Sequence, residues 1–119
     1  MIEATAPINF SALDTLKLVL GTEFPDLLHD FNQHCSNDLI KLEMAIVKLD
    51  RATIRDIAHT LKGSALSLHA KCLADYCSAL EADAMTASTA ELDQHATSVR
   101  DSVKETISAL DSWAFQKGL

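Results

Sequence analysis

A histidine, a lysine and a glycine lie close together near the middle of the chain. Lys62 and Gly63 follow His59 by three and four positions, and this spacing places residues side by side on one face of an α-helix. A neutral imidazole nitrogen is a nucleophile near pH 7, and an ammonium group beside it can offset the charge of a phosphoryl group. Glycine inside a helix costs about 1 kcal/mol relative to alanine. We therefore expect Gly63 to have a function, which is to leave room for a partner that approaches His59. The three residues predict a site that accepts a phosphoryl group.

The helix that carries these residues is expected over residues 51–68, and it has a distinct apolar face. Its predicted core stripe consists of Ile54, Ile57, Leu61, Ala65 and Leu68. At about 100° per residue, His59 lies roughly 160° from the centre of this stripe, so we expect its ring to point into solvent. Arg55 and Leu66 fall on the same exposed side. We expect Arg55 to supply a second positive charge and Leu66 to form the apolar centre of a partner-docking patch.

The remaining hydrophobic spacing predicts an all-α fold. After an irregular lead-in over residues 1–10, we expect helices at about 11–20, 23–49, 51–68, 70–84 and 88–114. Ser11 with Asp14 and Ser88 with Glu91 have the spacing of capping boxes, and Asp50 is an expected N-cap of the histidine helix. Short connections between long helices predict an antiparallel, up-and-down bundle.

Composition limits the classes of function. The 119 residues fit one domain, and the net charge of −7 argues against non-specific binding to nucleic acids or to anionic membranes. Three cysteines leave an odd number, which favours reduced thiols in a cytoplasmic protein over a disulfide framework. The N-terminal residues have no signal-peptide pattern, and no apolar run is long enough to span a bilayer.

Two other classes of function are compatible with a small helical bundle that exposes a histidine. One is a helical adaptor or inhibitor that docks on a partner through the His59 face without being phosphorylated. The other is a metal- or haem-binding bundle, for which His69, Cys72 and Cys77 are the candidate soft ligands. Their spacing lacks a fourth ligand of the kind found in zinc sites, so we expect no metal and no other cofactor.

The segment from Ala58 to Ser64, with the sequence AHTLKGS, strongly resembles the signature of histidine phosphotransfer (HPt) domains of bacterial multistep phosphorelays. Other positions match the flanking pattern of that family: Phe31, Leu39, Leu42, Ala45, Asp50, Leu73, Ala74, Cys77, Leu80 and Glu81. The resemblance covers nearly the whole chain. It implies a single HPt domain over residues 1–119, folded as an antiparallel four-helix bundle with a short extra N-terminal helix.

The resemblance also implies roles and partners. His59 would be the phosphorylated residue, Lys62 the basic residue beside the phosphoryl group, and Gly63 the small residue that admits a receiver domain. The chain would be a monomeric carrier without catalytic activity of its own. It would take the phosphoryl group from a receiver of a hybrid sensor kinase and pass it to the receiver of a response regulator, and each receiver would supply the aspartate and Mg²⁺. One departure is the sequence Leu68-His69-Ala70, because the family usually has glycine at the position of His69.

Overall fold

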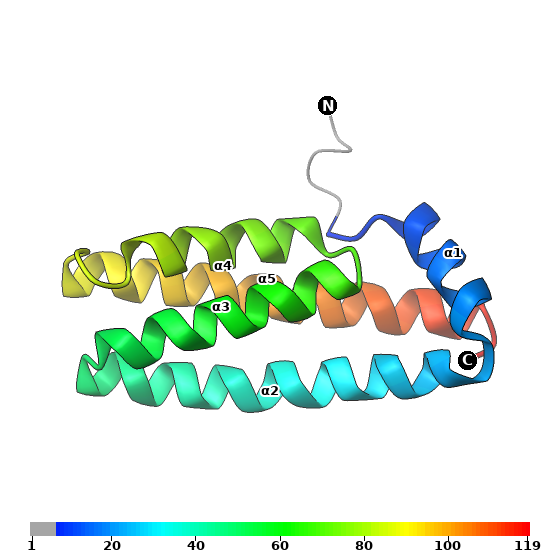
Figure 1. The fold of residues 1–119 in the computed structure, drawn as a ribbon, viewed down its shortest axis with the longest axis horizontal. Helices are drawn as coiled ribbons and strands as arrows, with labels where there is room; N and C mark the ends of the chain where they lie inside the picture. The colour runs from blue at the N-terminus through cyan, green and yellow to red at the C-terminus, as the bar shows by residue number, and fades with distance from the viewer. Residues whose placement is uncertain (1–6) are drawn as a thin grey trace.

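The computed structural model describes residues 7–119 and has the expected helical architecture (Figure 1). Its elements are α1 (Phe10–Leu20), the short 3₁₀ helix η2 (Gly21–Glu23), α2 (Phe24–Lys48), α3 (Arg51–Ser67), α4 (Lys71–Asp83) and α5 (Thr89–Gln116). Helices α2 to α5 form the antiparallel bundle, and α1 lies at the end where α2 begins. Helix α2 packs against α3 and α5, and α4 packs against the same two helices. The α2–α5 face is therefore opposite the α3–α4 face.

The bundle core forms where the apolar stripes of the helices meet. All five residues of the predicted α3 stripe are buried, and they pack with Leu42 of α2, Leu73 of α4 and Val99 of α5. Near α1, the rings of Phe24 and Trp113 meet edge to face with their centroids 5.6 Å apart. Because the core fixes the rotation of α3, it also determines which residues of that helix face solvent.

Two of the predicted helix starts are confirmed. The Asp50 carboxylate accepts a hydrogen bond from the Thr53 backbone N–H at 3.3 Å, which caps α3. The Ser88 hydroxyl accepts from the Glu91 N–H, while the Glu91 carboxylate accepts from the Ser88 N–H, so both halves of the capping box at α5 are present.

The capping box predicted at Ser11 and Asp14 is wrong. Helix α1 begins at Phe10, and its N-cap is Asn9, whose side-chain oxygen accepts from the Ala12 N–H at 3.1 Å. Asparagine is among the strongest N-cap residues, and its extended backbone leaves Ser11 already inside the helix. The lead-in predicted to be irregular is thus non-helical from Pro7 to Asn9, and its first six residues lie outside the part that the structure describes.

Two helices end at residues with left-handed backbones. Helix α2 continues unbroken to Lys48. Leu49, the expected last residue of this helix, instead has φ +53° and is 43% exposed. Helix α3 ends before His69, whose φ is +59°. The carbonyl of His69 accepts a hydrogen bond from the Asn9 N–H at 3.0 Å, which ties the start of α1 to the α3–α4 turn. Among the described residues, no helix is both long and apolar enough to cross a membrane.

Candidate phosphoacceptor site

The His59 side chain stands on the exposed side of α3, as its helical position predicts. Its side chain is 69% exposed, and its Nδ1 atom lies 2.9 Å from Oε2 of Glu81 on α4. The contact joins two neighbouring helices, because α3 and α4 pack against one another along their length. One ring nitrogen is therefore engaged by the protein, while the ring as a whole remains open to solvent.

Glu81 holds Lys62 as well as His59. Its second oxygen, Oε1, lies 2.8 Å from Nζ of Lys62. The hydrogen bond from Lys62, followed by that from His59, lowers the pKa of the Glu81 carboxyl below its usual value. The carboxylate is thus ionised at neutral pH and can only accept hydrogen bonds.

The ionised carboxylate determines the tautomer of a neutral His59 ring. Because Glu81 has no proton to give, the hydrogen in the 2.9 Å contact belongs to Nδ1 of His59, which donates it to Oε2. The lone pair of the neutral imidazole is then on Nε2, on the far side of the ring from Glu81. This arrangement resembles the carboxylate–imidazole pair of hydrolytic triads, in which the carboxylate orients the ring and stabilises its cation.

Gly63 leaves an open area one helical turn after His59. No heavy atom would lie within 4 Å of a Cβ added to Gly63, apart from its chain neighbours and the local helix backbone. Close packing inside this chain therefore does not require glycine at this position. A partner that approaches His59 along α3 would meet bare backbone at Gly63.

The other two predicted site residues lie on the same helix but do not contact the imidazole. Leu66 is 55% exposed, as a docking residue should be. Arg55 is about half exposed, and its Nε lies 3.9 Å from the carboxylate of its neighbour Asp56. The structure thus brings Lys62 to the Glu81–His59 pair and leaves Arg55 one turn away. Glu81 belongs to the flanking pattern that resembles the family, but its contact with His59 was not predicted from the sequence.

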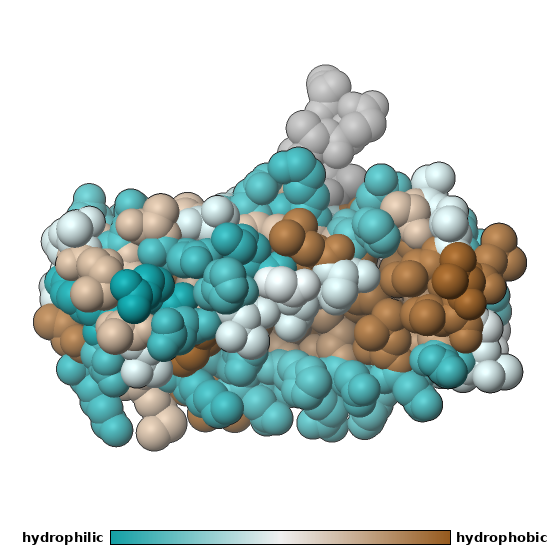
Figure 2. All heavy atoms as spheres, viewed as in Figure 1, coloured by the Kyte–Doolittle hydropathy of each residue, from teal (hydrophilic) through white to brown (hydrophobic). Residues whose placement is uncertain are grey.

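Apolar surface also gathers near one end of this face. Figure 2 shows brown, hydrophobic atoms over the region where Figure 1 places α1, beside the more hydrophilic surface of α3. The most exposed apolar residues of α1 are Leu18 and Val19, at 82% and 76%. Leu18, Val19 and Leu66 are thus all exposed apolar residues of α1 and α3.

The alternative metal ligands do not assemble. Cys77 is buried in the core, while His69 is exposed at the α3–α4 turn. Residues 7–119 contain no group of three or more histidine, cysteine or carboxylate side chains arranged to hold a metal ion. The side chain of His95 on α5 is 25% exposed, and its Nε2 lies 2.9 Å from the carboxylate of Asp83.

Comparison with known proteins relates this geometry to a family. A search of curated proteins gives no significant match. Among solved structures, the fold is similar to the crystal structure of histidine-containing phosphotransfer protein B from Pseudomonas aeruginosa PAO1. The TM-score is 0.87 at 22% identity, over 94% of this chain and 97% of that chain. The model of the Hpt domain matches residues 26–113, a range that includes His59, Lys62, Gly63 and Glu81. The chain therefore belongs to the Hpt domain family, whose members carry phosphoryl groups in phosphorelays.

Proposed function

We propose that His59 accepts a phosphoryl group through Nε2 from the aspartyl phosphate of a receiver domain and later returns it to the aspartate of another. The observation that carries this proposal is the contact of Nδ1 with Glu81, because it directs the lone pair of the exposed ring away from the protein. The first receiver belongs to a hybrid sensor kinase and the second to a response regulator.

The transfer exchanges one bond for another. The Nε2 lone pair attacks phosphorus, an N–P bond forms, and the P–O bond to the aspartate breaks so that the receiver carboxylate leaves. The ring, which keeps its proton on Nδ1, becomes a cation, and the ionised Glu81 stabilises that charge. When the phosphoryl group is passed on, the N–P bond breaks and the cationic ring leaves phosphorus as a neutral imidazole, which is a good leaving group. The same carboxylate therefore also allows the reverse step.

Lys62 then acts on the phosphoryl group by changing partners. Its Nζ is bound to Glu81 in the free protein, and the Lys62 side chain as a whole is 29% exposed, so it can turn toward the phosphoryl oxygens when these arrive. Arg55 adds a more distant positive charge. We propose that the carrier has no catalytic activity or cofactor of its own, and that the receiver supplies Mg²⁺ together with its acidic pocket.

A receiver docks on the exposed face of α3. Gly63 admits its backbone, while Leu66 supplies an apolar contact about two helical turns beyond the reacting histidine. The exposed residues Leu18 and Val19 extend the apolar area over α1. Transient interfaces of this kind combine an apolar centre with a polar rim.

The test uses a phosphorylated receiver, and acid-labile label is followed onto the full chain. We expect His59→Gln to abolish transfer. Label that still reaches the His59→Gln chain would refute the assigned acceptor. Lys62→Ala should slow transfer, while the circular dichroism spectrum and the unfolding midpoint should remain close to those of wild type. An unchanged rate of transfer would show that Lys62 does not act on the phosphoryl group.

The role of Glu81 has a separate readout. Nitrogen NMR of the unphosphorylated chain should show the proton of His59 on Nδ1, and phosphorylation should occur at Nε2. In Glu81→Ala, both preferences should weaken. If the tautomer and the phosphorylated nitrogen are unchanged, Glu81 is only a structural partner of Lys62.

A further inference from the structure

The outer face of α2 changes character half-way along the helix. Its first half presents polar residues to solvent, namely Asp26, His29 and Gln33. Its second half presents Ile40, Met44 and Val47, whose side chains are 60%, 54% and 86% exposed. The face of a surface helix turned away from the core is normally polar, and the core side of the same turns is already occupied by Leu42 and Ala45. The outer stripe is thus a second apolar face.

The spacing of this second face is that of a coiled-coil seam. Asn37, Ile40, Met44 and Val47 are separated by three, four and three positions, which assigns them to a, d, a and d of a heptad. The flanking positions are charged, with Lys41 and Lys48 at e and Glu43 at g. A polar residue at a single a position, here Asn37, is a device that fixes the register of paired helices.

The flanking charges select both the partner and its direction. In a parallel pair of helices, the g residue of one chain faces the e residue of the next heptad in the other. Glu43 would therefore face Lys48 of the second copy, and the two-fold axis would repeat this ion pair. An antiparallel pair would bring lysine against lysine and glutamate against glutamate. The sequence of α2 is thus complementary to itself in the parallel arrangement.

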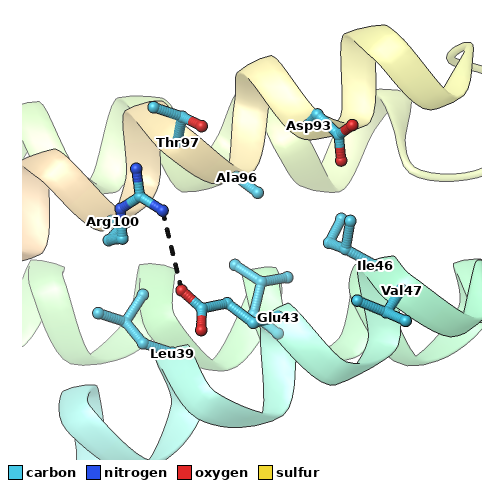
Figure 3. Close-up of a pocket in the computed structure, with 9 residues that line it drawn as sticks. Leu39, Glu43, Ile46, Val47, Asp93, Ala96, Thr97 and Arg100 are labelled. Atoms are coloured by element: carbon cyan, nitrogen blue, oxygen red, sulfur yellow. Dashed lines mark ion pairs between the residues drawn. The ribbon is translucent and has the colours of Figure 1, made fainter.

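The charged groups are open for such a contact. Among the described residues, Glu43 pairs only with Arg100 of α5, at 3.9 Å, across the groove that Figure 3 shows between α2 and α5. Direct hydrogen bonds are shorter than this distance, so the carboxylate keeps its capacity for a closer partner. Hydrogen bonds from Thr53 are the main cause of the lowered pKa of the nearby Asp50 carboxyl, and Lys48 adds only a small electrostatic effect. Within residues 7–119, however, Lys48 makes no ion pair.

We propose that two copies of this chain associate through the outer faces of their α2 helices, in parallel, as a weak two-fold symmetric dimer. The seam is only about two heptads long, so the affinity should be micromolar or weaker. The His59 site is built from α3 and α4 and lies away from this seam, so each copy keeps its own site. This differs from the monomer expected from the sequence.

The first test measures molar mass against concentration by sedimentation equilibrium on the full chain. Between about 10 µM and about 1 mM, the apparent mass should rise from 12.9 kDa toward twice that value. Met44→Glu should remain monomeric throughout. His29→Glu, on the polar half of the same helix, is the matched control and should associate like wild type.

The second test reverses the charges. Glu43→Lys and Lys48→Glu should each remain monomeric, because each places like charges across the seam. A mixture of the two variants should associate, because every facing pair is then opposite in charge. The proposal is overturned if the wild-type chain stays at 12.9 kDa, whether or not another protein binds the same face. Association that Met44→Glu does not change, or a mixture that stays monomeric, would also overturn it.

Discussion

Replacing Gly63 by alanine should make the protein more stable and a poorer phosphoryl carrier. Apart from its chain neighbours and the local helix backbone, the added methyl group meets no atom within 4 Å of its position, so the folded chain accommodates it without strain. Alanine is favoured over glycine inside a helix by about 1 kcal/mol, which corresponds to a rise in the unfolding midpoint of roughly 4 °C. In the complex, the same methyl group would press into the receiver. Overpacking of this size costs about 1–3 kcal/mol, or roughly 5- to 150-fold in the rate of transfer.

The assay pairs thermal unfolding with the rate of transfer from a phosphorylated receiver. Ser108→Ala is the control, because Ser108 is exposed on α5 and alanine there raises helix propensity without altering α3. We expect the control to be stabilised by a few tenths of a kcal/mol and to transfer normally. If Gly63→Ala is stabilised and transfers at the wild-type rate, the receiver does not pack against Gly63. If it is destabilised, the space found beside Gly63 is not available to a side chain.

Three further outcomes follow from the structure. His69→Gly should raise stability by about 0.5–1 kcal/mol in urea unfolding, because glycine relieves the left-handed backbone at φ +59°, whereas His69→Val should lower it. Burial raises the pKa of both Cys35 and Cys77 to about 12, so neither thiol should be alkylated at pH 8 until denaturant is added, as mass spectrometry of iodoacetamide-treated protein can check. Because the pKa of Glu81 is lowered in the folded chain, its contribution to stability is present above the ordinary glutamate value of about 4.3 and is lost as pH falls through the lowered pKa. The advantage of wild type over Glu81→Gln in urea unfolding should therefore be clear at pH 7 and shrink in acid, and an advantage independent of pH would contradict that role.

Much of the fold could be predicted because local signals and long-range packing agree. The α3 stripe places its residues every three or four positions, and all of them are buried. Asp50 and Ser88 cap the helices that they precede. The error at Ser11 has a simple cause, since Asn9 is a stronger cap two residues earlier and the apolar pattern of a short helix does not choose between them.

The site could be predicted only in part. The direction of His59 follows from one helix alone, because the rotation of α3 is set by its own stripe. The contact with Glu81 depends on how far α4 is shifted along α3, and that shift is set by the α3–α4 turn and by packing between the two helices. Periodicity within either helix carries no information about it. The lowered pKa of Glu81, and with it the tautomer of His59, therefore required coordinates.

The left-handed backbone at His69 connects the turn to the rest of the molecule. The Ala70 N–H donates to the Ala65 carbonyl at 2.9 Å, the closing bond of a helix C-cap, and the carbonyl of His69 receives the Asn9 N–H. A residue with φ near +60° is what allows α4 to turn back along α3. Histidine meets this requirement at a higher cost than glycine. The cost is tolerated because the surrounding bonds fix the turn. Since the turn sets the position of α4 relative to α3, it also sets the distance from Glu81 to His59. His69→Gly should thus preserve transfer while it raises stability, and a loss of transfer would show that the turn had shifted α4.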